Sequence, residues 1–365
     1  MSDITRQQAE EALRSLSDLY LPEDYFSLKA VDVLGVKHGE VSLHLVLGYP
    51  CKTQQPQLEE NLREALMAAG AKSVSVAVSF SAPVNTGKQI PESMAGVRNI
   101  VAIASGKGGV GKSTTTVNLA LALAAEGARV GILDADIHGP SQGLMLGLPK
   151  NTRPEVKDQK AFIPVEAHGI KVMSMAFLIT EDTPVVWRGP KATGALMQLL
   201  GQTLWGELDY LLIDMPPGTG DIQLTLSQKV NVTGSVIVTT PQDIALLDAI
   251  KGIEMFRKVD IPVCGVVENM ATHICSNCGH EEHLFGEGGG EKMAEQYGVD
   301  LLGSLPLTLS IRQQADSGAP TVVSQPDSKE AEEYRAIARK MAAQLWLKTL
   351  RQGGDNNLLQ AVELQ

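Results

Sequence analysis

The sequence predicts a chain of two parts: a small α+β domain at residues 1–82, then a larger α/β domain with a mostly parallel, doubly wound sheet at 99–351. In the larger part, short apolar runs such as "NIVAIAS", "RVGILD" and "DYLLID" alternate with helical patterns. Continuous runs of valine, isoleucine and leucine are typical of parallel strands that are covered on both faces. In the smaller part, apolar and polar residues alternate, which is typical of half-buried strands.

The smaller part is predicted to contain two strands with a helix between them. The stretches "EVSLHLVL" and "KSVSVAVSF" both alternate apolar with polar residues. Between them, one helix face is marked by apolar residues at helical spacing, which are Leu58, Leu62, Leu66 and Ala69. Proline, glycine and small polar residues interrupt the pattern at 83–98, where we expect a linker.

Five apolar runs follow the linker, and each is followed by a turn or the start of a helix: "NIVAIAS", "RVGILD", "DYLLID", "GSVIVT" and "PVCGVVEN". In open parallel sheets, ligands bind beyond the carboxyl ends of the strands. The motifs that carry chemistry in this sequence lie at those ends. We therefore expect one functional edge of the sheet.

Composition limits the classes of partner. The chain has 365 residues, 44% of them hydrophobic, and a formal net charge of −11, which disfavours general attraction to nucleic acid or to anionic membranes. The N-terminus is polar, and no apolar run approaches the roughly 18 residues that span a bilayer. We expect a cytoplasmic protein that binds proteins or small molecules. Four cysteines in so long a chain do not predict a disulfide framework.

The stretch "SGKGGVGKSTTT" at 105–116 is the main motif. Its glycines fit the dinucleotide fingerprint G-x-G-x-x-G, but the pair Lys112–Ser113 also fits the phosphate loop G-x-x-x-x-G-K-[ST]. A cation and hydroxyls at a helix N-terminus favour phosphate, and the serine can bind Mg²⁺. We therefore expect ATP to bind at one continuous loop: Gly106, Lys107, Gly108, Gly109, Val110, Gly111, Lys112, Ser113 and Thr114.

Acidic residues end two of the following strands. Asp214 follows "YLLI", where a phosphate-loop protein carries a second group for Mg²⁺ besides Ser113. Asp134 and Asp136 in "LDADIHGPS" lie at the end of the second strand, where a carboxylate can orient the attacking water; one of the two is as well explained as a helix cap. We expect Asp136 to act in catalysis. Gly218 supplies mobile backbone near the γ-phosphate, so Asp134, Asp136 and Gly218 are the predicted switch positions.

Two further motifs follow the strand "PVCGVV". The side-chain amide of Asn269 can pair with the edge of a purine, although asparagine at a strand end commonly forms a turn. Cys275 and Cys278 can grip one metal, but tetrahedral sites need four ligands. The missing ligands can come from neighbouring histidines or from a second copy of the chain; the histidines are His273, His280 and His283. Spacing alone slightly favours structural zinc over an iron-sulfur cluster.

The stretch "GKGGVGKST" resembles the deviant Walker A motif of the MinD and ParA class of dimeric ATPases. In that class the early lysine reaches across a nucleotide-sandwich homodimer to the phosphates bound by the partner. The resemblance implies that Lys107 acts on the other chain while Lys112 acts on its own. With Asp136, these two lysines are the expected catalytic residues.

Within that class, the chain resembles the Mrp/ApbC family of iron-sulfur cluster carriers from about residue 99 to 325. The stretches that carry the resemblance are "DADIHGPS", "WRGPKATGALMQLL", "DYLLIDMPPGTGDIQLTLSQ" and "CSNCGHEEHLFGEGGG". The resemblance implies ATP hydrolysis, a [4Fe-4S] cluster that bridges a dimer through Cys275 and Cys278, and transfer of that cluster from an assembly scaffold to apo-proteins. Zinc is the competing metal.

Residues 5–80 resemble a small domain that also occurs alone in iron-sulfur assembly proteins. Cys51 falls near the cysteine of that domain, but its flanks, "GYPCKTQQ", depart from the usual Pro-Gly-Cys-Pro. Two other functions stay open: a positioning ATPase that acts on membrane or DNA, and an interaction module with structural zinc. The mixed charges of the C-terminal helix favour a docked helix with a flexible tail at 352–365 over a membrane anchor.

Overall fold

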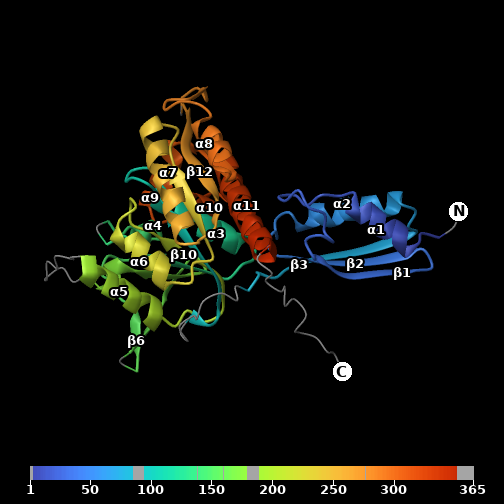
Figure 1. Ribbon diagram of the computed structural model, residues 1–365, viewed down its shortest axis with the longest axis horizontal. Coiled ribbons are helices and arrows are strands. Elements are labelled where there is room, and N and C mark those ends of the chain that lie inside the picture. The colour runs from blue at the N-terminus through green and yellow to red at the C-terminus, as the bar shows by residue number, and fades with distance from the viewer. Residues whose placement is uncertain are drawn as a thin grey trace. The chain divides into compact units, whose positions relative to one another are not determined.

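The computed structural model describes residues 3–84, 94–137, 139–158, 160–178, 189–275 and 277–351. The middle of the predicted linker and the predicted tail at 352–365 lie outside these ranges. Contacts divide the chain into two compact units (Figure 1). Unit 1 comprises Met1–Thr86, Ala125–Gly127 and Ala342–Gln365, and unit 2 comprises Gly87–Ala124 and Ala128–Met341.

Unit 1 contains a three-stranded sheet in the order β1-β2-β3. Its strands are β1 (Val31–Lys37), β2 (Glu40–Leu47) and β3 (Ser73–Phe80). β1 and β2 are antiparallel, whereas β2 and β3 are parallel and are connected through helix α2 (Gln55–Ala68). Helix α1 (Arg6–Arg14) precedes the sheet and begins with a capping box at Thr5. The predicted small α+β domain is confirmed.

Apolar periodicity explains how this sheet and its helix pack. The inward positions of β2 are buried, and they are the alternate residues Val41, Leu43, Leu45 and Leu47. On α2, Leu58, Leu62 and Leu66 are buried. Their spacing places them along one side of the helix, so α2 and β2 contribute their apolar faces to one core.

Unit 2 contains a nine-stranded sheet in the order β13-β12-β11-β4-β10-β5-β9-β8, with β14 also paired to β12. The parallel strands are β4 (Val97–Ala104), β5 (Val130–Asp134), β9 (Ile170–Ser174), β10 (Leu208–Asp214), β11 (Gly234–Thr239), β12 (Val263–Ile274) and β14 (Leu301–Leu307). Two short strands are antiparallel, β8 (Val165–Ala167) and β13 (Glu281–Glu282). Every residue of β5, β10 and β11 is buried, as expected for strands covered on both faces.

Helices connect most of these strands. The longer ones are α3 (Lys112–Ala125), α5 (Gly189–Gln202), α6 (Asp221–Lys229), α7 (Asp243–Lys258), α8 (Gly289–Tyr297), α9 (Leu309–Asp316) and α11 (Lys329–Arg351). The shorter elements are α4 (Gln142–Met145), α10 (Thr321–Ser324), the 3₁₀ helix η2 (Met175–Leu178) and the ribbon of β6 (Glu155–Lys157) with β7 (Ala161–Ile163). Across the described ranges, no helix combines the length and the apolarity needed to cross a bilayer.

The register of the central strands sets the functional edge. β10 lies between β4 and β5, and Asp214 is paired with Ile103 on one side and with Asp134 on the other. The loop between β4 and α3 therefore faces the ends of β5 and β10. Gly109 and Gly111 in this loop both have φ of +81°, a left-handed conformation that glycine adopts without strain. The sheet brings the phosphate-loop motif and both predicted acidic ends to one edge.

Candidate functional site

A pocket of about 230 Å³ lies over the N-terminus of α3. It is lined by groups from the loops after β4, β5 and β10: Ser105, Lys107, Gly108, Gly109, Gly111, Lys112, Ser113, Thr114, Asp136, Ser141, Met145 and Pro217. Most of the predicted phosphate-loop residues and one predicted switch carboxylate thus share one small pocket. Backbone N–H groups and the dipole at a helix N-terminus favour bound phosphate there.

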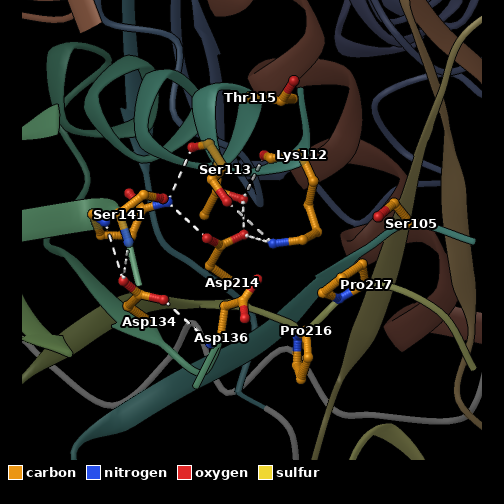
Figure 2. A network of polar contacts seen from close by, with 12 residues as sticks. Ser105, Lys112, Ser113, Thr115, Asp134, Asp136, Ser141, Asp214, Pro216 and Pro217 are labelled. Carbon is orange, nitrogen blue, oxygen red and sulfur yellow. Dashed lines mark hydrogen bonds and ion pairs between the residues drawn. The ribbon is translucent and has the colours of Figure 1, made fainter. Parts of the chain in front are cut away.

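Lys112 and Asp214 form a buried ion pair at the floor of this pocket (Figure 2). The Lys112 Nζ lies 2.6 Å from Asp214 Oδ1, and the two side chains are 6% and 0% exposed. The same ammonium lies 3.2 Å from Ser113 Oγ. Each charge compensates the other in a site that excludes water. The carboxylate expected to serve Mg²⁺ therefore holds the cation expected to serve phosphate.

Gln142 and Thr116 also donate hydrogen bonds to Asp214, and sequence reasoning predicted neither contact. Gln142, at the start of α4, donates from Nε2 to Asp214 Oδ2 at 2.8 Å and to the Ser113 carbonyl at 3.0 Å. Thr116 donates to Asp214 Oδ1 at 3.0 Å. The Gln142 Oε1 atom is buried and has no hydrogen-bond partner within the described part of the chain. Gln142 thereby connects the Asp214 carboxylate with the phosphate loop.

Asp134 organises the loop after β5. Its fully buried carboxylate accepts hydrogen bonds from the backbone N–H groups of Asp136, Ser141 and Gln142 and from the Ser174 hydroxyl, at 2.9–3.2 Å. Two of these donors begin α4, so Asp134 acts as the cap that was one of its two expected roles. Burial, followed by the nearby charge of Asp214, raises the pKa of Asp134 to about 7.

The other two predicted switch positions lie beside the pocket. Asp136 is half-buried, and its carboxylate accepts a hydrogen bond from Gly139 N–H at 3.2 Å. Gly218 has φ of +94°, which favours glycine, and its N–H donates to the Ser105 carbonyl at 2.9 Å. This bond joins the loop after β10 to the phosphate loop. A displacement of either loop would therefore strain this bond and disturb the other loop.

The two lysines of the motif have different partners. Lys107 Nζ contacts Gln242 Oε1 at 3.4 Å, just before α7, whereas Lys112 Nζ contacts Asp214. Lys107 is half-buried at the pocket wall. The two ammonium groups therefore have different partners within the chain, and their separate tasks stay a prediction.

A second pocket of about 480 Å³ adjoins the first, and both share Gly111 and Thr114. Its wall is mainly apolar and comes from β12, β14 and the start of α9, with Met270, Leu284, Pro306, Leu307, Leu309, Ile311 and Tyr334. The polar residues in its wall are Asn269, His273, Thr308 and Arg312. An apolar pocket that continues from a phosphate site has the form needed for a nucleoside base.

Asn269 lies in the wall of this second pocket, as its predicted role requires. Its Nδ2 donates to the Val110 carbonyl at 2.8 Å, so the amide also fixes the phosphate loop. The apolar wall itself was missed by sequence reasoning. Its residues come from segments far apart in the chain, and the run "LPLTLS" carries no signal that separates a pocket wall from an ordinary core.

Cys275 and Cys278 lie in the turn between β12 and β13, where Cys275 is half-buried and Cys278 is exposed. Cys275 N–H donates to the His280 carbonyl, and Gly279 N–H donates to the Cys275 carbonyl, both at 2.9 Å. Hydrogen bonds from the backbone of Asn277, from the backbone of Cys278 and from the Cys278 thiol lower the pKa of Cys275. The turn thus presents two thiols, one of them biased toward the thiolate that binds metals.

Two of the three neighbouring histidines contact backbone carbonyl groups through one ring nitrogen. His273 Nδ1 lies 3.3 Å from the Leu307 carbonyl, and His283 Nδ1 lies 3.1 Å from the Ala271 carbonyl. Among the residues that the structure describes, no group of three or more His, Cys, Asp or Glu side chains is placed to hold a metal ion. The described chain therefore offers two thiolates without a third grouped ligand. Cys51 is buried in unit 1 and Cys264 in β12.

Comparison with known proteins matches the two parts of the chain to two protein families. Residues 96–342 match a family model described as NUBPL iron-transfer P-loop NTPase, and residues 6–79 match one described as iron-sulfur cluster assembly protein. An iron-sulfur cluster carrier protein of Pseudomonas fragi is 70% identical over 257 residues, 70% of this chain and 89% of the relative. The protein of that name in Escherichia coli K12 is 48% identical over 355 residues, 95% and 96% of the two chains.

Among solved structures, a nucleotide-binding protein from Archaeoglobus fulgidus in complex with ADP is 39% identical, with a TM-score of 0.57. The match covers 66% of this chain and 93% of that one. The predicted fold class, a P-loop NTPase with a mostly parallel sheet preceded by a small α+β domain, is confirmed.

The position of Gln142 predicts a magnesium-dependent effect. Gln142→Leu should weaken Mg²⁺–ADP binding about tenfold, because hydrogen bonds to a charged group contribute roughly 1.5–3 kcal/mol. ADP binding in EDTA should change much less. Titration calorimetry measures both, and Gln198→Leu, at an exposed glutamine on α5, is the matched control. Equal losses with and without Mg²⁺ would show that Gln142 has no role in positioning Asp214.

Proposed function

The chain belongs to the family of NUBPL iron-transfer P-loop NTPases, and from this premise we propose that it hydrolyses ATP and carries a [4Fe-4S] cluster to apo-proteins. The observation that carries the proposal is that a buried phosphate-site network and a pair of thiols, one half-buried and one exposed, lie in the same unit. The first supports nucleotide hydrolysis, and the second supports reversible binding of a cluster.

The first step of ATP binding changes the partner of the Lys112 ammonium. The phosphates of ATP replace Asp214 as the partner of the Lys112 ammonium, which lies at the N-terminus of α3. The Ser113 hydroxyl and the Asp214 carboxylate supply the oxygen donors that Mg²⁺ prefers, and they fit that ion by their chemistry. Mg²⁺, when bound, neutralises charge on the phosphates. Gln142 and Thr116 keep the Asp214 carboxylate in place during this exchange.

Hydrolysis then needs an oriented water and a further cation. Asp136 lines the phosphate pocket, and this position supports the role of its carboxylate in holding the attacking water. Lys107 from a second copy of the chain supplies the cation that stabilises charge on the leaving phosphate. The Ser105–Gly218 bond gives the loop after β10 a way to respond when that phosphate leaves.

The cluster is cargo held between two copies. A [4Fe-4S] cluster takes four thiolate ligands, and each chain supplies Cys275 and Cys278. Two copies related by a twofold axis supply four. The exposure of Cys278 suits a cluster that is passed to an acceptor, because an acceptor thiolate must reach an iron atom and take the place of the carrier's cysteine as its ligand.

Lys112 should be needed for both turnover and stability. Lys112→Ala should abolish ATP turnover and should also lower the free energy of unfolding by roughly 3–5 kcal/mol, because it leaves Asp214 buried without its partner. Lys112→Arg keeps the charge and should recover much of the stability. A coupled phosphate-release assay and denaturant unfolding measure the two effects. Normal turnover by Lys112→Ala would exclude this loop as the site of hydrolysis.

The separate tasks of the two lysines can be tested in mixed dimers. Lys107→Ala and Asp136→Ala chains should each be inactive alone, yet a mixture should recover up to about a quarter of wild-type ATP turnover. The mixed dimer retains one site with Asp136 from one chain and Lys107 from the other. Affinity tags of two kinds verify that mixed dimers form. If those dimers stay inactive, Lys107 serves the site of its own chain.

Metal content distinguishes the cluster from zinc. Anaerobic reconstitution with iron and sulfide should give about four irons per dimer and an absorption band near roughly 400 nm, as thiolate-ligated clusters show. Cys275→Ala or Cys278→Ala should lose both, whereas Cys264→Ala, at a buried cysteine of β12, should retain them. One tightly bound zinc per chain that depends on His280 or His283 would reject the cluster assignment.

A further inference from the structure

The two cysteines form the tip of a hairpin whose two arms both contribute residues to the wall of the 480 Å³ pocket. β12 pairs with β13 through His273–Glu282 and Ile274–Glu281, and the turn between them carries Cys275 and Cys278. His273, on the first arm, lines the 480 Å³ pocket. Leu284, just beyond the second arm, lines it too. A ligand in this pocket would touch both arms of the cysteine hairpin, which we define by the described residues 271–275 and 277–284.

The other end of β12 contacts the phosphate loop. Asn269 Nδ2 donates to the Val110 carbonyl at 2.8 Å. At Gly111, an added Cβ atom would come within 2.0 Å of the same Nδ2 atom, so the strand and the loop leave no space between them. Met270 follows and lines the pocket. One strand therefore contacts the phosphate loop, forms the pocket wall and ends directly before Cys275.

The pairing of β12 with β14 is irregular between Asn269 and the cysteine turn. The register between β12 and β14 shifts between Asn269 and His273, so the regular ladder is broken there. Met270, within this break, has φ of +58°, a left-handed conformation that is uncommon for a residue with a side chain. Such irregular positions persist where the surroundings impose them, and they are frequent in segments that switch. The cysteine hairpin is thus joined to the sheet through an irregular segment.

We propose that the base of the bound nucleotide, and not its phosphates, fixes the cysteine hairpin through His273 and Leu284. The inference rests on the proposed function, because it assigns the 480 Å³ pocket to the base. A base in this pocket contacts Met270 and covers Leu284, which is 53% exposed. Its apolar contacts order both arms, and the arms hold the two thiols in one relative position. Without a base, the irregular segment leaves the hairpin free to change its orientation.

The consequence is a reciprocal coupling of two sites. If the base orders the hairpin into the arrangement that binds a cluster, cluster binding must raise the affinity for ADP by the same factor. Pyrophosphate, which lacks a base, must lack this coupling. The comparison of ADP with pyrophosphate therefore separates the contribution of the pocket from that of the phosphate loop.

Hydrogen exchange on the full-length, reduced, metal-free chain tests the inference. Mg²⁺–ADP should slow amide exchange at least about fivefold in residues 271–288, since ordering a segment suppresses its local opening. Mg²⁺–pyrophosphate, at a concentration that protects residues 105–113 equally well, should leave 271–288 unchanged. If pyrophosphate slows exchange in the hairpin as much as ADP does, the inference is overturned. It is also overturned if ADP slows exchange in residues 105–113 but not in 271–288.

A matched pair of variants locates the coupling. Leu284→Ala should retain the protection of residues 105–113 by ADP but lose most of the protection of the hairpin. Leu247→Ala, which removes a similarly exposed leucine on α7 outside the pocket, should behave like the wild type. His273→Ala, made as a second single variant, should lose the hairpin protection in the same way. Full hairpin protection in both single variants would contradict the assigned contacts.

The outcomes separate this inference from the proposed function. ADP that fails to bind in calorimetry overturns the nucleotide assignment and the coupling together. Hairpin protection by ADP in a chain that takes up no cluster on reconstitution supports the coupling and contradicts the carrier function. In a chain that takes up the cluster, an unchanged affinity for ADP overturns the coupling and leaves the carrier function intact.

Discussion

The buried ion pair between Lys112 and Asp214 is the constraint on which the site depends. Both side chains are almost completely shielded from water, so neither charge is stable there alone. The pair therefore fixes the start of α3 against the end of β10, and Gln142 and Thr116 arrange their hydrogen bonds around the same carboxylate. In the function that we propose, phosphate takes the place of Asp214 beside Lys112. The same step would release a carboxylate next to Ser113, where Mg²⁺ is expected.

Events at this pair can reach the thiols because the sheet places them in one framework. β4 carries the phosphate loop, and β12 touches that loop through Asn269 before it ends at the cysteine turn. The base pocket lies along the same strand. In the function that we propose, a nucleotide contacts the framework twice, with its phosphates at α3 and with its base at the cysteine hairpin. This arrangement would give the nucleotide a physical means to change how a cluster is held.

Local sequence patterns predicted the fold and the central residues of the candidate site, because each of these patterns is formed by residues that are neighbours in the sequence. The strands followed from apolar runs, and Lys112, Ser113 and Asp214 followed from their positions at a helix start and a strand end. Partners that are distant in sequence could not be predicted. Gln142 beside Asp214 and Val110 beside Asn269 depend on the packing of separate elements, as does the apolar pocket wall. The sequence likewise placed three histidines near the cysteines without showing that the carbonyl groups of Leu307 and Ala271 engage two of them.

Our proposal requires that the nucleotide bound at the phosphate site changes how the cysteine pair holds a cluster. The most direct test is single-turnover transfer of the cluster from the reconstituted chain to an apo-protein that accepts a [4Fe-4S] cluster, followed by circular dichroism. The transfer rate should differ clearly between Mg²⁺–ATP, Mg²⁺–ADP and no nucleotide, and the difference should vanish in Lys112→Ala. Identical rates in all three states, from a wild-type chain that hydrolyses ATP, would contradict the account.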